Sequence, residues 1–396
     1  MASRSISINL PSLAFNQLLD NNVAQLYSAA TALKPDGNLA VSPLSILYAS
    51  ALMYIGSSGS TKSNLEKSFH FDQYFSSNTD SVLSAFSTSM ANLTSVKTDG
   101  GPFVINLANG IFLQKGSPFV NKFKDAGVSK LKSEAQFKDF RTGAEKARGE
   151  INTWVSDKTN GRIKDLLPSV SADAIAILVN ALYFKASWES WAKFDPSLTV
   201  KMDFTLLNGQ KTKVNMMQNF LYSLAYAEDS TLDAKYIEYT YTNNLGAMLF
   251  LLPNKKNGLR ALEKKLTAGI FNTLKKKAKE ERVSLQIPKF KVETSFNLKT
   301  LLQKIGVKEA FDKNSADFSY MTPQKPVWIG AASHKTFVEI DEQGTEAAAA
   351  SAFEMPEGAS MQEEPPKEFV ADHPFIFAIR HNPTNAILFL GRVEIF

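Results

Sequence analysis

The four histidines are the side chains best suited to acid-base or metal chemistry at neutral pH: His70, His334, His373 and His381. None of them has the spacing of a metal-binding motif such as H-E-x-x-H. The sequence also contains no G-x-S-x-G nucleophile motif, no G-x-x-x-x-G-K-[ST] and no G-x-G-x-x-G. The absence of cysteine excludes cysteine nucleophiles and cysteine-based zinc sites. We therefore predict no catalytic residue, no metal site and no cofactor, and we do not expect an enzyme.

The segment from Thr336 to Phe369 is the most unusual part of the sequence. Its first residues alternate between two faces up to Ile340, which predicts a strand. After Gly344 come a threonine, a glutamate and four alanines, followed by an acidic stretch interrupted by glycine and proline. Such a composition is typical of an exposed loop, and we expect one over 343–370.

The strand alternation can be continued through this loop. Both early charges, Glu346 and Glu354, then fall on one face. The other face carries small side chains first and apolar ones later: Thr345, Ala347, Ala349, Ser351, Phe353 and Met355. Small residues at the start would enter between two existing strands at little steric cost. The pattern fits a loop that can become a strand, and the alternative interpretation is a low-complexity alanine linker.

The sequence from Glu342 to Ser351, EQGTEAAAAS, resembles the hinge of the serpin family, and Asp372–Arg380 resembles its C-terminal signature. Motifs in the same order recur along nearly the whole chain. The resemblance implies an α+β fold, with helices packed on a large, mostly antiparallel main sheet and on smaller sheets. It implies a single domain over 1–396 that contains an exposed reactive-centre loop. The hinge residues are then Glu342, Gly344, Thr345, Glu346, Ala347, Ala348, Ala349 and Ala350.

A buried helix is expected to begin after Ser42 and to end near Ile55. Ser42 is a good N-cap, and Pro43 suits the first helical position because its missing N–H needs no partner there. The segment resembles the second helix of serpins, whose two serines lie under the central sheet. Ser42 and Ser45 are the matching positions, and a helix cap with a core-facing hydroxyl is the plainer alternative.

The nearly unbroken apolar run over 174–184 predicts a central strand, in which Asn180 needs a buried hydrogen-bond partner. The resemblance implies that His334 is this partner and that the pair bridges adjacent strands where the loop must enter. Trp188 matches the tryptophan at the top of that opening. Further on, the alternation over 283–292 predicts one more strand of a sheet.

A helix that follows Thr142 is expected to lie across the main sheet. Thr142 and Glu145 have the spacing of a capping box. The helix that they would start carries an apolar face: Ala147, Ile151, Trp154 and Val155. In the family such a helix must yield when a strand enters beneath it.

Length and composition indicate a globular protein. The 396 residues are 44% hydrophobic and include 28 phenylalanines, enough for an extensive core. The first 30 residues show no signal-peptide core, and no run of about 18 apolar residues occurs later. The compartment stays open between extracellular and cytoplasmic, and we expect a monomer with no membrane partner.

The net charge of +5 has one concentrated source, the run Lys275–Lys279 followed by Arg282, which we expect on a helix. A solvated face is the favoured interpretation, and a polyanion site is the alternative. The segment 80–92, used for glycosaminoglycan binding in some serpins, contains no lysine or arginine. We predict neither glycosaminoglycan nor nucleic-acid binding.

The resemblance implies a suicide inhibitor of serine proteases. Family spacing places the reactive bond between Gly358 and Ala359, with Glu357 and Met361 as alternative registers. No lysine or arginine lies between Thr345 and Pro366, so trypsin-like targets are not expected. Elastase-like or chymotrypsin-like proteases fit better, and a glutamate-preferring protease would fit Glu357. The alternative function is a non-inhibitory serpin that acts as a binding or chaperone module.

Overall fold

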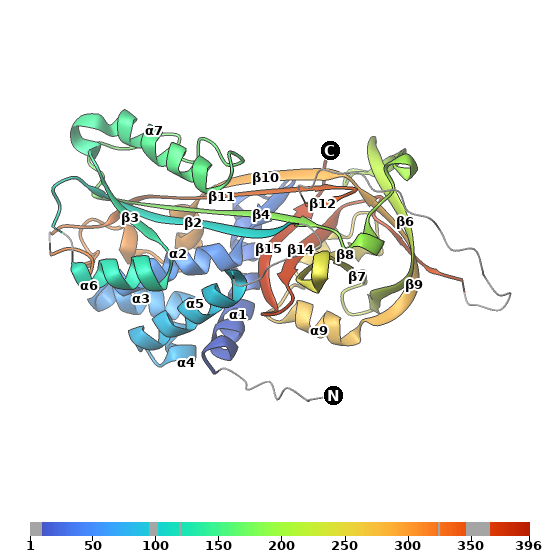
Figure 1. The fold of residues 1–396 in the computed structure, drawn as a ribbon, viewed down its shortest axis with the longest axis horizontal. Helices are drawn as coiled ribbons and strands as arrows, with labels where there is room; N and C mark the ends of the chain where they lie inside the picture. The colour runs from blue at the N-terminus through green and yellow to red at the C-terminus, as the bar shows by residue number, and fades with distance from the viewer. Residues whose placement is uncertain (1–9, 95–101, 119, 324, 346–364) are drawn as a thin grey trace.

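The computed structural model describes residues 10–94, 102–118, 120–323, 325–345 and 365–396. Within these ranges, helices and strands form the predicted α+β arrangement (Figure 1). The helices are α1 (Leu10–Leu33), α2 (Pro43–Gly56), α3 (Gly59–Phe69), α4 (Phe71–Phe75), α5 (Thr79–Thr94), α6 (Asn121–Lys124), α7 (Phe140–Lys158), α8 (Leu259–Glu263), α9 (Ile270–Lys277) and α10 (Leu298–Lys304). No helix among the described residues is both long and apolar enough to cross a bilayer.

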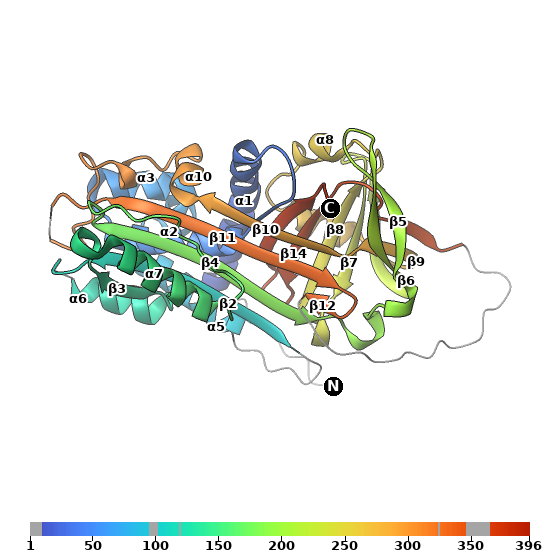
Figure 2. The same ribbon diagram turned by 90° about the horizontal axis from the view of Figure 1, so that it is seen from above.

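The central sheet has six strands in the described ranges, in the order β10-β11-β12-β4-β2-β3. Figure 2 shows its long strands side by side, with β12 between the right-hand ends of β11 and β4. The pairs β4–β11 and β2–β3 are parallel and the others are antiparallel. These strands are β2 (Phe103–Gln114), β3 (Glu134–Lys138), β4 (Ala176–Ser187), β10 (Phe290–Asn297), β11 (Ile329–Asp341) and β12 (Gly344–Thr345).

The remaining strands of the described ranges form one continuous nine-stranded sheet instead of several small ones. Its order is β1-β15-β14-β8-β7-β6-β9-β13, and β5 pairs with β6. Its members are β1 (Leu39–Val41), β5 (Val200–Thr205), β6 (Lys211–Asp229), β7 (Ala234–Thr240), β8 (Gly246–Pro253), β9 (Lys279–Pro288), β13 (Lys367–Val370), β14 (Phe375–His381) and β15 (Ala386–Val393).

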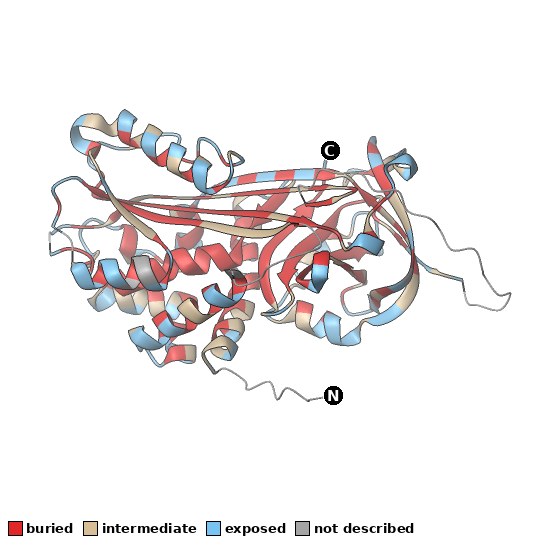
Figure 3. Ribbon diagram, viewed as in Figure 1, coloured by how far each residue is buried: buried red, intermediate tan, exposed pale blue. Residues whose placement is uncertain are grey.

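Helix α2 lies at the centre of the molecule. Every one of its residues is buried, as expected for a helix that is apolar on all sides, and Figure 3 shows it red along its length. Its N-cap is Ser42, whose Oγ accepts the Ser45 N–H at 3.2 Å. The predicted cap and the predicted buried helix are both confirmed.

Helix α7 covers the face of the central sheet opposite α2 (Figure 1). Its buried residues Ala147, Ile151 and Val155 pack in a cluster with side chains of β2 and β4. The expected capping box is wrong: Asp139 is the N-cap, and its carboxylate accepts hydrogen bonds from the Thr142 N–H and hydroxyl. Because Asp139 caps a first turn, α7 begins three residues earlier than predicted, and its backbone is non-helical at Gly143 (φ −139°, ψ 38°).

Two further predictions were wrong in their boundaries. The strand expected over 283–292 is two strands, because β9 ends at Pro288 in one sheet and β10 begins at Phe290 in the other. Likewise α9 ends at Lys277, so the basic run continues into β9 and does not lie on a single helix. The end of β9 has a physical reason, because Pro288 has no N–H to donate to a strand ladder.

Candidate functional site

A seam between β4 and β11 is the central feature of the candidate site. The two strands pair directly from Ala176 opposite Ile329 up to Leu182 opposite Thr336. Above that level they no longer pair, and β12 lies between them, antiparallel to both. The two strands are therefore unpaired with each other over 183–187 of β4 and 337–341 of β11, and the two residues of β12 fill the end of this opening.

The register of β12 matches that of the closed part of the seam. In the closed part, His334 lies opposite Asn180, an offset of 154 residues. Thr345 lies opposite both Ile340 of β11 and Ala186 of β4, and these two residues are again 154 apart. A strand that continued from Thr345 would thus meet residues that already face each other, so β4 and β11 need to separate sideways without sliding.

The turn into β12 is built by Asp341 and Gly344. Oδ1 of Asp341 accepts the N–H groups of Gln343 at 2.8 Å and Gly344 at 3.1 Å, while burial raises the pKa of Asp341. Gly344 has φ +146°, and a Cβ there would lie 2.2 Å from the Ala186 carbonyl oxygen. Only glycine brings the backbone this close to β4.

Aromatic side chains enclose the end of β12. Thr345 is 1% exposed, and its hydroxyl lies 2.7 Å from the Tyr241 hydroxyl. The Tyr241 ring stacks on Trp188 with centroids 4.6 Å apart. Trp188 also donates from Nε1 to the Asp341 carbonyl and from its backbone N–H to the Gln343 carbonyl, both at 2.9 Å. Trp188 therefore fixes both the turn and the aromatic floor of the opening.

An ion pair holds the start of the hinge. Glu342 accepts from Lys289 Nζ at 2.8 Å and from the Thr199 hydroxyl at 2.9 Å. Burial acts to raise the pKa of Glu342, but the hydrogen bonds from Lys289 and Thr199 outweigh it, so the pKa is lowered. The carboxylate ties the hinge to the link between β9 and β10.

A buried polar cluster spans the closed part of the seam. Asn180 Oδ1 accepts from the Ser45 hydroxyl at 2.9 Å and lies 2.5 Å from His334 Nδ1. Asn180 Nδ2 donates to the Ser45 carbonyl at 2.8 Å and to Asn109 Oδ1 on β2. The structure thus brings together four predicted residues, Ser42, Ser45, Asn180 and His334, and joins α2, β2, β4 and β11.

His334 is neutral within this cluster. Its Nε2 accepts the Ser42 N–H at 3.2 Å, so Nδ1 carries the proton and donates it to Asn180. The side chain is completely buried, and this burial lowers the pKa of His334 to about 3. A second proton would cost both the desolvation of the charge and the bond from Ser42.

The predicted loop is only partly covered by the structure. The hinge residues from Glu346 to Ala350 and the reactive-bond candidates Glu357, Gly358, Ala359 and Met361 lie outside the described residues. At both ends of 343–370 the expected exposed loop is corrected. Thr345 is buried in β12, and Phe369 is fully buried in β13, which pairs parallel with β9.

Several residues of the site were not singled out from the sequence. Asn109 lies opposite Asn180 in the ladder. Tyr241 follows β7 and Lys289 links β9 to β10, and both contact the hinge although they lie far from it in the chain. Asn109 carried a signal, because an amide in the buried half of a largely apolar strand needs a buried partner. Among the described residues, no group of three or more histidine or acidic side chains is arranged to hold a metal ion.

Comparison with known proteins agrees with this geometry. A family model described as serpin (serine protease inhibitor) matches residues 19–395. The leukocyte elastase inhibitor of Equus caballus is 35% identical over 379 residues, which cover 93% of this chain and 95% of the relative. Serpin48 of the insect Tenebrio molitor has a TM-score of 0.85 at 26% identity, covering 99% of this chain and 100% of its own. Human thyroxine-binding globulin, solved in complex with thyroxine, has a TM-score of 0.87 at 26% identity, covering 97% of this chain and 99% of its own.

Proposed function

Because the chain belongs to the serpin family, we propose that it inhibits serine proteases as a suicide substrate. The matching family model and the leukocyte elastase inhibitors similar to this chain are named as inhibitors, so the chain is not an enzyme. The attacking serine is that of the target, which cleaves a loop peptide bond and remains esterified to the new carboxyl end. The amine side of the bond leaves with the segment that β13 holds in the nine-stranded sheet. The acylated side is free to enter the seam.

The observation that carries this proposal is the shared offset of 154 residues at the open and closed parts of the seam. If β12 is continued beyond Thr345 in this register, each added residue faces one existing pair of residues of β4 and β11. Ser351 would then lie opposite both Asn180 and His334. Since Thr345 points its side chain toward Tyr241, Ala347, Ala349, Ser351 and Phe353 would face the same core side.

The length of the proposed inserted strand agrees with the sequence. The last pair of the closed seam before its irregularity joins Ile177 and Ala331, and by the same register it would face residue 354. Pro356 follows two residues later, where no further aligned pair requires a backbone donor. The part of the loop that can donate backbone hydrogen bonds and the part of the seam that can accept it therefore end at about the same residue.

Strand addition supplies the driving force, and serpin loop insertion is one of the standard examples of this binding mode. A central strand bonds to two neighbours, while only the single ladder between β4 and β11 is lost. The net gain is about one hydrogen bond per inserted residue, each worth about 0.5–1.5 kcal/mol. About nine residues, from Glu346 to Glu354, would then stabilise the inserted state by about 5–15 kcal/mol. The uncleaved fold is metastable to that extent.

The target class follows from the loop sequence. We retain Gly358–Ala359 as the proposed reactive bond, with Glu357 and Met361 as alternatives. A small residue before the bond suits an elastase-like protease, and the horse relative is itself named an elastase inhibitor. Met361 would suit a chymotrypsin-like protease. The absence of a basic residue disfavours trypsin-like targets.

A non-inhibitory role is the second candidate, because human thyroxine-binding globulin has the same fold and was solved in complex with thyroxine. The fold alone therefore does not decide between the two functions. The hinge favours inhibition, since Ala347–Ala350 are small enough to enter the seam, whereas bulky or charged residues there would obstruct it.

The test is incubation with leukocyte elastase, chymotrypsin, trypsin and a glutamyl protease, followed by a denaturing gel and intact-mass measurement of the released C-terminal fragment. We expect a covalent band with an elastase-like or chymotrypsin-like protease and a fragment that begins at Ala359. Cleavage without a covalent band, and without a gain in thermal stability, would support the non-inhibitory candidate.

A further inference from the structure

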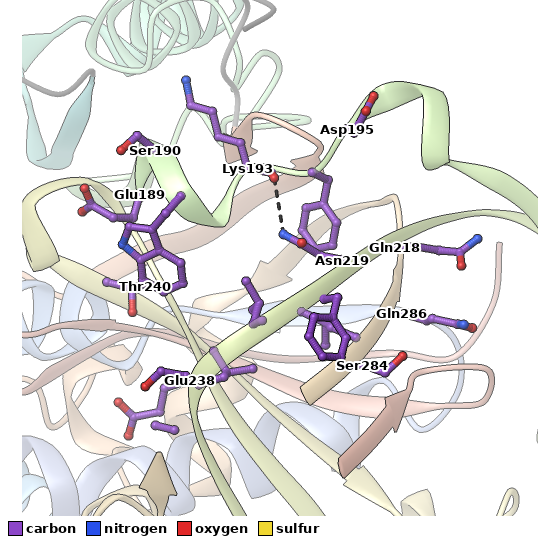
Figure 4. A pocket seen from close by; sticks show the side chains of 18 of the residues that line it. Glu189, Ser190, Lys193, Asp195, Gln218, Asn219, Glu238, Thr240, Ser284 and Gln286 are labelled. Carbon is purple, nitrogen blue, oxygen red and sulfur yellow. Dashed lines mark hydrogen bonds between the residues drawn. The ribbon is translucent and has the colours of Figure 1, made fainter. Parts of the chain in front are cut away.

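A large groove lies on the flank of the molecule beside the hinge. It encloses about 1190 Å³. One border is the segment 189–198, and the other is formed by neighbouring strands β6 and β9 (Figure 4). In the close-up, Ser190, Lys193 and Asp195 lie along the first border and Ser284 and Gln286 along the second.

The two borders are the direct neighbours of the two ends of the reactive loop. On the first border, the Phe194 N–H donates to the Glu342 carbonyl at 3.0 Å. On the second border, Ser284 and Gln286 are the β9 residues that pair with β13, where the chain re-enters the sheet. Anything bound to the loop is thereby held next to this groove.

Several exposed apolar side chains of the protein line this groove. Among the described residues, nine large apolar side chains are exposed, and three of them line this one groove. Trp191 is 44% exposed, Leu198 42% and Phe220 41%. Clustered exposed aromatic side chains mark interaction sites, and tryptophan is the most enriched residue at interface hot spots.

The groove is also acidic within a basic protein. Glu189, Asp195 and Glu280 line it together with Lys193, and Arg282 lies beside it with its guanidinium 5.7 Å from the centre of the Phe220 ring. A fourth carboxylate, Glu238, is already neutralised by Arg380. The lining is therefore net negative in a chain of net charge +5, which favours a partner with a positive surface.

We propose that this groove docks the body of the target protease, through basic and apolar side chains that lie beside the protease's own active site. The proposal rests on the proposed inhibitory function and adds a second contact beyond the loop. Gly358 precedes Lys367, the first residue of β13, by nine residues, so the bond lies within about 32 Å of the β13 end. A protease of about 230 residues has a radius of gyration of about 17 Å. A protease bound at the loop is therefore large enough to reach the groove.

Docking of this kind affects how the inhibitor and the protease first associate, and it does not affect the later insertion of the cleaved loop. Opposite charges steer the two proteins together, and apolar contacts slow their dissociation. Changes in the groove should alter how fast a given protease is captured. They should leave the number of inhibitor molecules consumed per trapped protease unchanged, because this number depends on loop insertion.

The experiment compares two groove variants with two matched controls. Glu280→Lys and Trp191→Ala change the groove, while Asp173→Lys and Tyr320→Ala make the same kinds of change at exposed positions that do not line it. Binding is measured with leukocyte elastase and chymotrypsin whose catalytic serine is replaced by alanine. Capture rate and stoichiometry are measured with the active proteases.

We expect both groove variants to weaken binding and slow capture of at least one protease by about fivefold to tenfold, with unchanged stoichiometry and controls within twofold of the parent protein. Groove variants that match the parent protein would overturn the groove proposal alone. A parent protein that docks the inactive proteases but traps none of the active ones would overturn the inhibitory function alone.

Two other occupants of the groove would give distinct results. If Trp191→Ala strengthens protease binding, the chain's own loop occupies the groove, and the proposal is wrong. If the protein sediments as a dimer that Glu280→Lys dissociates, the groove belongs to a second copy, which also overturns the proposal.

Discussion

His334 of β11 and Asn180 of β4 lie opposite each other across the seam and share a hydrogen bond of 2.5 Å. The bond is buried and belongs to a cluster that also contains Ser45 and Asn109. Any strand that enters the seam must separate these two side chains. In the proposed register Ser351 would take the place between them, with a hydroxyl that can both donate and accept.

The first prediction concerns pH. Burial lowers the pKa of His334 to about 3, whereas an unfolded histidine titrates near about 6.5. Between these values the unfolded chain binds a proton that the folded chain rejects, so the free energy of unfolding falls as pH falls from about 6.5 toward 3. The loss from His334 should be about 2 kcal/mol at pH 5. Denaturation at pH 7 and pH 5 measures it, and His334→Gln should show a smaller pH difference; an equal one would contradict the assignment.

The second prediction concerns the hinge ion pair. Lys289→Met should lower the free energy of unfolding by about 1–2 kcal/mol, because it leaves the Glu342 carboxylate without its charged donor. Since the pKa of Glu342 is lowered, the contribution is complete at neutral pH and disappears as pH falls through the folded pKa. Lys213→Met breaks the more exposed pair with Asp203 and serves as the control, with an effect below about 1 kcal/mol. Equal losses in both variants would refute the special role of the hinge pair.

The third prediction concerns the entry point of the strand. Thr345→Arg places a charge where the side chain is 1% exposed and bonded to Tyr241. The cost of burying it is several kcal/mol. The uncleaved chain can avoid this cost by withdrawing residue 345 from the seam, whereas a fully inserted strand cannot, so insertion should be disfavoured and the inhibitor should become a substrate. Thr345→Val removes the hydroxyl contact but stays uncharged, and it should still trap protease. Active-site titration measures the stoichiometry, and an unchanged value for Thr345→Arg would show that the register is wrong.

The sequence predicts those parts of the site whose contacts lie within one short segment of the chain. The Ser42 cap and the apolar run around Asn180 are local signals, and both led to correct elements. The Thr142 box was also a local signal, but Asp139 accepts the Thr142 N–H that the Glu145 side chain would have accepted in such a box. Local patterns identify elements well and their first residues less well.

Contacts between strands far apart in the chain were found only where family resemblance supplied them. His334 was assigned to Asn180 in this way, whereas Lys289 was not assigned to Glu342, although both pairs link distant parts of the chain. Their geometry follows from strand order and register, which periodicity within one strand does not contain. The offset of 154 residues likewise became visible only from the pairing of three strands.

The most direct test of the account locks the seam. Because the chain has no cysteine, Val179→Cys with Ser333→Cys, a facing pair of β4 and β11, can form one defined disulfide across it. Ala108→Cys with Ala181→Cys makes the matched bridge between β2 and β4, which insertion does not separate. We predict that the oxidised seam lock is cleaved by the protease without forming a covalent complex, that reduction restores the complex, and that the control traps protease in both states. A covalent complex formed equally well by the oxidised seam lock would contradict insertion between β4 and β11.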